Sequence, residues 1–196
     1  DIVTEMHEAG ELAPLLGVAG KRPVGVPDVT VGAEAVAAFR RFVDRIEEGG
    51  TLIVCAEDPG ALEIAEYAKR QGNRSLTYSA DPAVPADYSV HDIAPVPGAG
   101  FAFAAHRGDT YIADLALQVP GRHNAQNALG VMAVIDSLGL PADKAALALN
   151  DFRGTGRRFE ARPEAGGVLI VDDYAHHPTE IRASLAAARE RYPQRR

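Results

Sequence analysis

Polar side chains suited to binding a charged, hydrogen-bonding ligand are concentrated in three short segments of this 196-residue sequence. The first is residues 120–128 (PGRHNAQNA), where His123, Asn124 and Asn127 stand at the expected start of a helix. Asparagines three residues apart share one helical face, and their amides donate and accept hydrogen bonds, as the edge of a purine base requires. A helix N-terminus also attracts anions. The alternative is that Asn124 only caps the helix.

The second segment is residues 152–160 (FRGTGRRFE), a glycine-rich turn followed by the adjacent Arg157 and Arg158. A guanidinium at the mouth of such a turn can hold phosphate oxygens through two parallel hydrogen bonds. The glycines also let backbone N–H groups approach the ligand. The segment is therefore a candidate phosphate-binding turn, and the alternative is a solvated basic turn whose arginines pair with neighbouring acids.

The third segment is residues 172–177 (DDYAHH), directly after the apolar run 168–171, which we predict to be a buried strand. Ligands gather at the carboxyl ends of strands in α/β sheets, so a carboxylate here is well placed to bind ribose hydroxyls. Asp and His are also ligands of first-row metals, which keeps a metal site open as an alternative. Neighbouring residues do not share a face, so one metal ion could take at most two or three of these side chains.

The elements that must position these segments are readable from apolar spacing. From residue 33 onward, apolar residues recur at three- and four-residue steps and predict a helix that Gly49 and Gly50 end; they are Val36, Phe39, Val43 and Ile46. Residues 51–56 form a continuous apolar run, typical of a parallel strand buried on both faces. The single cysteine, Cys55, lies in this run, and we expect it in the core. A helix at 61–70 follows.

Between residues 75 and 120 the pattern changes to short β-like runs at 75–79, 88–93, 100–106 and 110–119. We predict an antiparallel flap here, with a hairpin turn at 107–110. Helical spacing returns at 127–138 and 142–150. Pro178 suits the first turn of a closing helix with Ile181 and Leu185 on its inner face. Residues 1–32 are expected to be loop-rich after a short strand at 2–4, because glycine and proline interrupt them closely.

Composition excludes several classes of protein. The sequence is 46% hydrophobic and 24% charged, within the range of globular domains. Its formal net charge of −7 argues against nucleic acid as a general partner. No stretch approaches the roughly 18 consecutive apolar residues of a membrane span, and the acidic first residues do not resemble a signal peptide. We therefore expect a cytoplasmic protein with no membrane partner.

Taken together and in order, segments 121–128, 152–159 and 172–181 resemble the Mur ligases of peptidoglycan synthesis. The resemblance runs from about residue 33 to residue 196, and it is strongest to the members that join L-alanine to UDP-N-acetylmuramate. It implies an α/β fold: a partial central ATPase-type domain with an antiparallel β flap over residues 33–165, and the first strand and helix of a Rossmann-like C-terminal domain over residues 166–196. Residues 1–32 have no assigned origin.

The resemblance also implies a reaction and a set of nucleotide-binding residues. ATP and Mg²⁺ would activate the muramate carboxylate as an acyl phosphate, and the amine of L-alanine would then displace phosphate. Asn124 and Asn127 match the family's nucleotide-pocket asparagines, with His123 beside them. Arg158 matches the arginine near the nucleotide phosphates, and Asp173 matches the aspartate associated with the ribose.

Two further residues come from the same resemblance. Tyr174 and His176 match positions where the C-terminal domain closes over the amino-acid substrate, so they are the implied substrate-binding residues. Arg158 and His176 are the implied catalytic residues. The expected small-molecule partners are UDP-N-acetylmuramate and L-alanine, and the family's place is in cell-wall biogenesis, cell shape and cell division.

The sequence departs from the family pattern in places that matter for activity. No Gly-Lys-Thr phosphate-binding loop is present, since the only Gly-Lys pair, Gly20-Lys21, is followed by Arg22. Glu5 and His7 stand where the family has an asparagine and a magnesium-binding glutamate, so no metal ligand is assigned. We expect a partial ligase that is inactive as an isolated chain.

Three alternatives to an inactive partial ligase are also compatible with the sequence. The first is a non-catalytic nucleotide-binding or interaction module derived from the family. The second is a ligase that recycles murein peptides by attaching a whole peptide. The third is a small metal hydrolase that uses Asp172, Asp173, His176 and His177.

Overall fold

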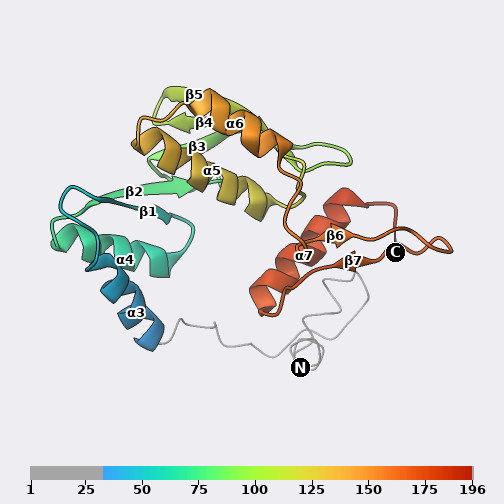
Figure 1. Cartoon of the computed structure of the whole chain (residues 1–196), viewed down its shortest axis with the longest axis horizontal. Helices are drawn as coiled ribbons and strands as arrows, with labels where there is room; N and C mark the ends of the chain where they lie inside the picture. Colours follow the sequence, from blue (N-terminus) through green and yellow to red (C-terminus); the bar gives the residue numbers. More distant parts are fainter. Residues whose placement is uncertain (1–32, 196) are drawn as a thin grey trace.

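A five-stranded mixed sheet forms the centre of the computed structural model, which describes residues 33–195 (Figure 1). Its strands stand in sequence order: β1 (Thr51–Cys55), β2 (Arg74–Ser79), β3 (Tyr88–Pro95), β4 (Phe101–Arg107) and β5 (Thr110–Ala116). The α/β class is confirmed. The loop-rich start predicted for residues 1–32 lies outside the described residues.

The predicted antiparallel flap covers only the second half of this sheet. Strands β3, β4 and β5 pair antiparallel, and Arg107 faces Thr110 across the predicted hairpin. Strand β2 instead pairs parallel with both β1 and β3. The β1–β2 pair is parallel because the connection between these strands contains helix α4 and returns the chain to the same end of the sheet.

Four helices flank the sheet: α3 (Ala33–Val43), α4 (Pro59–Arg70), α5 (Arg122–Ser137) and α6 (Ala142–Asp151). Neighbouring residues of β1 show that α4 and α5 lie on opposite faces, because Leu52 packs against the α3–α4 cluster while Ile53 packs against the main core. Alternation along β4 buries Phe101, Phe103 and Ala105 on the α5 side. This packing fixes the start of α5, where the first polar segment lies.

Two expectations about the N-terminal part of the sheet are wrong. Helix α3 ends at Val43, before Gly49, and Phe39 on its predicted inner face is 57% exposed. Strand β1 lies at the edge of the described sheet and its residues, except Val54, are only half-buried. Cys55 is therefore half-buried rather than a core residue.

The C-terminal part consists of the two-stranded pair β6 (Glu160–Ala161) and β7 (Val171–Asp172), followed by α7 (Pro178–Arg191). The predicted buried strand at 168–171 is wrong in position and burial, since Val168 and Ile170 are 62% and 60% exposed. Within residues 33–195, β7 pairs only with β6, so these apolar side chains have no sheet face to pack on.

Helix α7 begins as predicted, with Pro178 in its first turn, and His177 and Glu180 form a capping box at its start. Ile181 and Leu185 are half-buried. The closest packing of α7 is at Ala187, which is fully buried. A Cβ atom added at Gly121 would stand only 3.1 Å from the Ala187 Cβ. Glycine at position 121 therefore lets α7 approach the start of α5.

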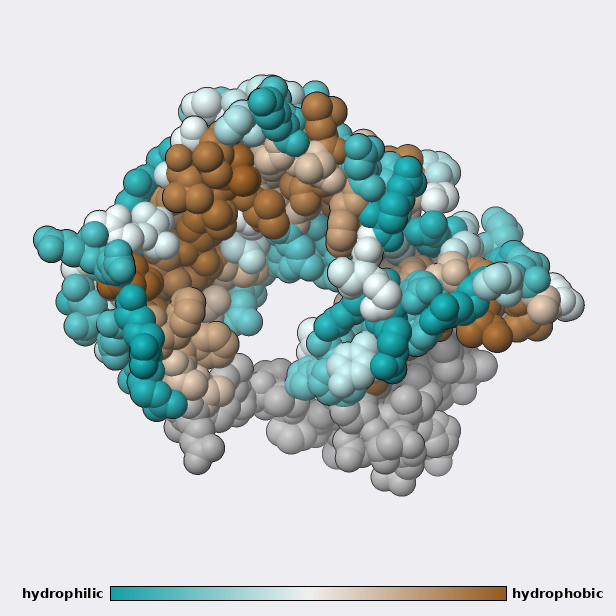
Figure 2. Space-filling view, viewed as in Figure 1, coloured by the Kyte–Doolittle hydropathy of each residue, from teal (hydrophilic) through white to brown (hydrophobic). Residues whose placement is uncertain are grey.

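Apolar surface is also exposed on the helices of the sheet domain (Figure 2). Three large apolar side chains on α5 and at its C-cap are more than two-fifths exposed: Val131, Val134 and the C-cap residue Leu138. In the same view the molecule is hollowed between this part and the part that holds α7. No helix among the described residues is both long and apolar enough to cross a membrane.

Candidate functional site

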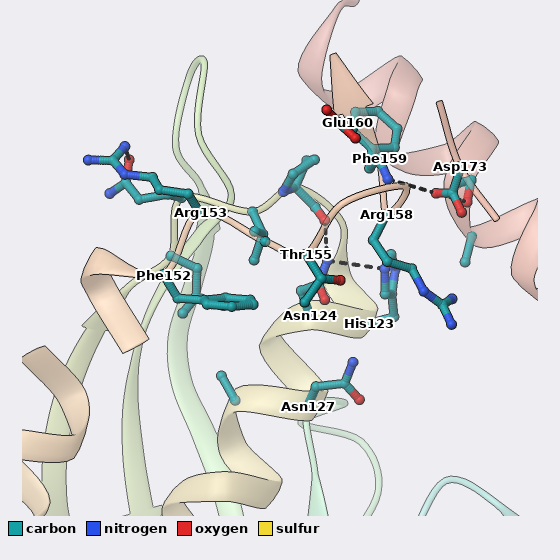
Figure 3. Close-up of a pocket in the computed structure, with 18 of the residues that line it drawn as sticks. His123, Asn124, Asn127, Phe152, Arg153, Thr155, Arg158, Phe159, Glu160 and Asp173 are labelled. Carbon is teal, nitrogen blue, oxygen red and sulfur yellow. Dashed lines mark hydrogen bonds between the residues drawn. The ribbon is translucent and has the colours of Figure 1, made fainter. Parts of the chain in front are cut away.

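A cleft of about 1100 Å³ lies between the start of α5, the turn at 152–161 and α7 (Figure 3). All three polar segments singled out from the sequence contribute to its wall. The structure brings five of the predicted site residues together there: His123, Asn124, Asn127, Arg158 and Asp173. Tyr174 and His176 do not line it.

The start of α5 presents amide groups to this cleft. The N-cap residue is Gly121 in a left-handed conformation with φ 93°, and it makes no side-chain cap. The hypothesis that Asn124 caps the helix is therefore wrong. Its Nδ2 instead donates to the Pro120 carbonyl oxygen at 2.7 Å. Asn127, about one turn further along, is exposed in the cleft and has no hydrogen-bond partner within residues 33–195.

Charged side chains from both other segments of the cleft shift the pKa of His123. The surrounding protein atoms remove water from the imidazole and lower its pKa. The Asp173 carboxylate opposes this effect, and the Arg158 guanidinium adds to it. The net result is a pKa below the ordinary value of 6.5, which favours the neutral imidazole.

The basic turn has an unusual backbone on both sides of Arg158. Arg157 has φ 58° and Phe159 has φ 50°, and both values lie in the left-handed region. Hydrogen bonds hold these two residues: Arg157 N donates to Glu160 Oε2 at 3.0 Å, and Phe159 N donates to Asp173 Oδ2 at 3.1 Å. The turn is thus built by specific contacts.

The two arginines of this turn have different surroundings. The Arg157 guanidinium lies 5.1 Å from the centre of the Tyr174 ring, and its Nε is 4.0 Å from Asp172 Oδ1. Arg157 therefore fits the alternative of a basic residue paired with neighbouring groups. No hydrogen bond or ion pair within the described residues engages the Arg158 guanidinium, which lines the cleft. Arg158 therefore offers a cation to an incoming anion.

Asp173 is the most heavily hydrogen-bonded side chain of the cleft. Its Oδ2 accepts from Phe159 N and, at 2.9 Å, from Ser184 Oγ on α7, and its Oδ1 accepts from Ala175 N at 2.9 Å. A carboxylate offers about four acceptor positions. Three are filled, so about one remains for a ligand hydroxyl.

Tyr174 and His176 lie outside the cleft and close to each other. Their ring centres are 5.2 Å apart, and both side chains are exposed. His176 Nδ1 is 3.4 Å from Glu180 Oε2, and the same carboxylate accepts from the backbone N–H groups of His176 and His177. These hydrogen bonds lower the pKa of Glu180.

The metal-hydrolase hypothesis is not supported by this arrangement. Asp172 pairs with Arg162 at 3.0 Å, Asp173 accepts backbone and serine hydrogen bonds, and His177 caps α7. No group of three or more His, Cys, Asp or Glu side chains that could hold a metal ion occurs in the part of the chain that the structure describes. These residues serve the local structure of the third segment instead.

Several cleft residues were not predicted from the sequence. Phe152 and Val131, each 45% exposed, add apolar side chains to the wall of the cleft. Glu180 and Ser184 line the cleft from α7. Their spacing of four residues places them on one face of a helix. This spacing is the feature of the sequence from which the pair could have been predicted. No local signal indicates which apolar side chains would face the ligand.

The fold and the cleft define an α/β protein with a candidate ligand site between a helix N-terminus and a basic turn, an arrangement suited to anions. The chain belongs to the Mur ligase family: residues 33–135 match the Mur ligase middle domain, and residues 157–196 match the family described as Mur ligase, glutamate ligase domain.

Individual relatives agree with this assignment. The UDP-N-acetylmuramate–L-alanine ligase of Acidothermus cellulolyticus is 46% identical over 153 residues, which are 78% of this chain and 31% of that protein. The ligase of the same name from Roseiflexus sp. is 42% identical over 82% of this chain and 36% of its own length. The chain thus spans about a third of the length of these curated relatives.

Solved structures of the family share the fold. UDP-N-acetylmuramate-alanine ligase MurC from Thermotoga maritima superposes with a TM-score of 0.64 at 28% identity, over 82% of this chain and 34% of that one. MurF from Acinetobacter baumannii gives a TM-score of 0.65 at 25% identity, over 78% and 32% of the two chains.

Proposed function

We propose that this chain supplies part of the ATP site of a ligase that joins L-alanine to UDP-N-acetylmuramate. The observation that carries the proposal is the pairing, in one cleft, of the Arg158 guanidinium with the Asn127 amide, neither of which has a hydrogen-bond partner within residues 33–195. The first suits a phosphate group and the second suits the edge of a base. The names of the most similar curated relatives point to the same reaction.

The residues of the cleft fit a nucleotide in a definite order. The base would lie against Phe152 and Val131, within reach of the Asn127 amide. Arg158 would lie at the phosphates. The remaining acceptor position of Asp173 would receive a ribose hydroxyl.

When bound, ATP supplies the phosphoryl group that activates a carboxylate. In this chain, Arg158 would neutralise phosphate charge. The lowered pKa of His123 favours its uncharged form, so the positive charge at the phosphates would come from Arg158. Within residues 33–195, no group of three or more His, Cys, Asp or Glu side chains is placed to hold Mg²⁺.

The domain division follows from the same proposal. Residues 33–165 would form the partial central domain and residues 166–196 the start of the C-terminal domain. Tyr174 and His176, which lie outside the cleft, would face the amino-acid substrate, with His176 in the catalytic role. Because the Gly-Lys-Thr loop is not in this sequence, we propose that the isolated chain binds nucleotide without hydrolysing it.

The test is a calorimetric titration of the 196-residue chain with ATP. We expect measurable binding in the wild type and weaker binding in Arg158→Lys, because an ammonium cannot reproduce the planar fork of a guanidinium. The matched control is Arg74→Lys at the start of β2, away from the cleft, which should bind as the wild type does. Absence of ATP binding by the folded wild-type chain would refute the proposal.

A further inference from the structure

We propose that Asp173 is a positioning residue for Arg158: its carboxylate holds the turn that directs the Arg158 guanidinium into the cleft. The inference rests on the proposed function, because it assigns Asp173 a part in phosphate binding. It goes beyond a ribose contact, since the effect of Asp173 would reach a ligand that has no ribose.

The backbone around Arg158 needs support of this kind. Arg157 and Phe159 both have positive φ, and a non-glycine residue adopts such a conformation only when the surrounding contacts hold it there. Three hydrogen bonds do so: Arg157 N to Glu160 Oε2, Tyr174 N to the Arg157 carbonyl oxygen at 2.8 Å, and Phe159 N to Asp173 Oδ2. Only the last of them acts on the residue directly after Arg158.

Asp173 is itself fixed from two other directions. Ser184 Oγ donates to the same oxygen that receives Phe159 N, and Ala175 N donates to the other oxygen. The carboxylate therefore joins the basic turn, the segment after β7 and helix α7. A carboxylate that is fixed by three hydrogen bonds restricts the backbone of the turn more than a solvated carboxylate would.

The influence of Asp173 on Arg158 passes through the backbone and does not involve a direct ion pair. No ion pair joins the two side chains among the described residues, although both line the cleft. Figure 3 shows Asp173 directed at the Phe159 amide while the Arg158 side chain extends past His123. The guanidinium therefore stays available to an anion, with the carboxylate occupied elsewhere.

The experiment uses tripolyphosphate as the probe, because it has the phosphate chain of ATP and lacks base and ribose. Calorimetry would compare the wild-type chain with Asp173→Asn and Ser184→Ala. We expect Asp173→Asn to weaken tripolyphosphate binding about tenfold, and Ser184→Ala about threefold, as for the loss of a charged and a neutral hydrogen-bond partner. Ser137→Ala at the end of α5 is the matched control and should change nothing.

A double-mutant cycle with ATP provides the second readout. If Asp173 acts through Arg158 in addition to any ribose contact, Asp173→Asn should weaken ATP binding less once Arg158→Ala is present. A direct ribose contact alone would instead leave the full effect of Asp173→Asn in that background. Circular dichroism of each variant establishes that it is folded, and Ser184→Ala decides the test if Asp173→Asn does not fold.

The outcomes separate the two proposals. Unchanged tripolyphosphate affinity in the folded variants, with reduced ATP affinity, would overturn the positioning role and leave the proposed function intact. If the wild type binds ATP and not tripolyphosphate, the double-mutant cycle with ATP decides whether Asp173 acts through Arg158. A wild-type chain that binds neither ligand would remove the proposed function itself.

Discussion

The Asn124 amide favours one tautomer of the neighbouring His123 ring. Asn124 Nδ2 donates to the Pro120 carbonyl oxygen at 2.7 Å and lies 3.1 Å from His123 Nε2. The first contact requires the NH₂ group at this position, because the reversed amide would place two acceptors together. With the amide in this orientation, the contact suits the His123 tautomer that accepts at Nε2 and carries its proton on Nδ1.

Stability at acidic pH should therefore depend on His123. Its pKa is lowered in the folded chain, so the unfolded chain binds more protons as the pH falls. The contribution to stability is present above 6.5, the ordinary value, and is lost as the pH falls from there through the folded pKa. We expect His123→Gln to show a smaller loss of unfolding free energy over this range in urea titrations. His91→Gln, outside the cleft, is the control, and identical acid profiles for wild type and His123→Gln would contradict this role.

The amide of Asn127 is predicted to contribute directly to ATP affinity. Asn127→Ala should weaken ATP binding by about 1 to 3 kcal/mol, the range for a lost hydrogen-bonding partner of a buried ligand group. Calorimetric titration measures the change, and Asn73→Ala in the turn before β2 serves as the matched control. An unchanged affinity in Asn127→Ala would assign this residue no part in the nucleotide site.

A buried tyrosine is predicted to govern stability at alkaline pH. Tyr88 is fully buried, its hydroxyl donates to Asp136 Oδ2 at 2.8 Å, and burial together with this carboxylate raises its pKa to about 12. Since the folded pKa is raised above the ordinary value of 10.0, stability is present below 10.0 and is lost as the pH rises through about 12.

Tyr88→Phe tests this prediction. At neutral pH we expect a loss of about 1 kcal/mol in unfolding free energy, because the hydrogen bond is gone while Arg107 still pairs with Asp136 at 3.2 Å. Above pH 10.0 the variant should lose less stability than the wild type, as measured by denaturant unfolding. Tyr174→Phe, at an exposed tyrosine outside the cleft, is the control. A steeper alkaline loss in Tyr88→Phe would count against this account.

Cys55 is predicted to be a slow nucleophile. Burial raises the pKa of its thiol, and Gln126 Nε2 donates to its Sγ at 2.9 Å. The thiolate is the reactive form, so a higher pKa reduces the rate at neutral pH. We expect a thiol reagent to modify Cys55 more slowly in the folded chain than in the same chain unfolded in urea. Equal rates in the two states would show that the thiol is not protected.

The sequence by itself determined the local elements and the chemistry of the cleft. Helix α5, the hairpin at 107–110 and the start of α7 at Pro178 follow from residue spacing and from turn chemistry, which act over a few neighbouring residues. The amides of Asn124 and Asn127 were likewise recognisable, because both stand at one end of one helix.

Only the tertiary structure decided how the three segments meet. It places Asp173 against the Phe159 amide, leaves Tyr174 and His176 outside the cleft, and adds Ser184 from α7. It also exposes the apolar run at 168–171, because a strand is buried only where another surface covers it. These outcomes depend on contacts between residues that are far apart in sequence. The spacing of neighbouring side chains does not report the free energy of such contacts.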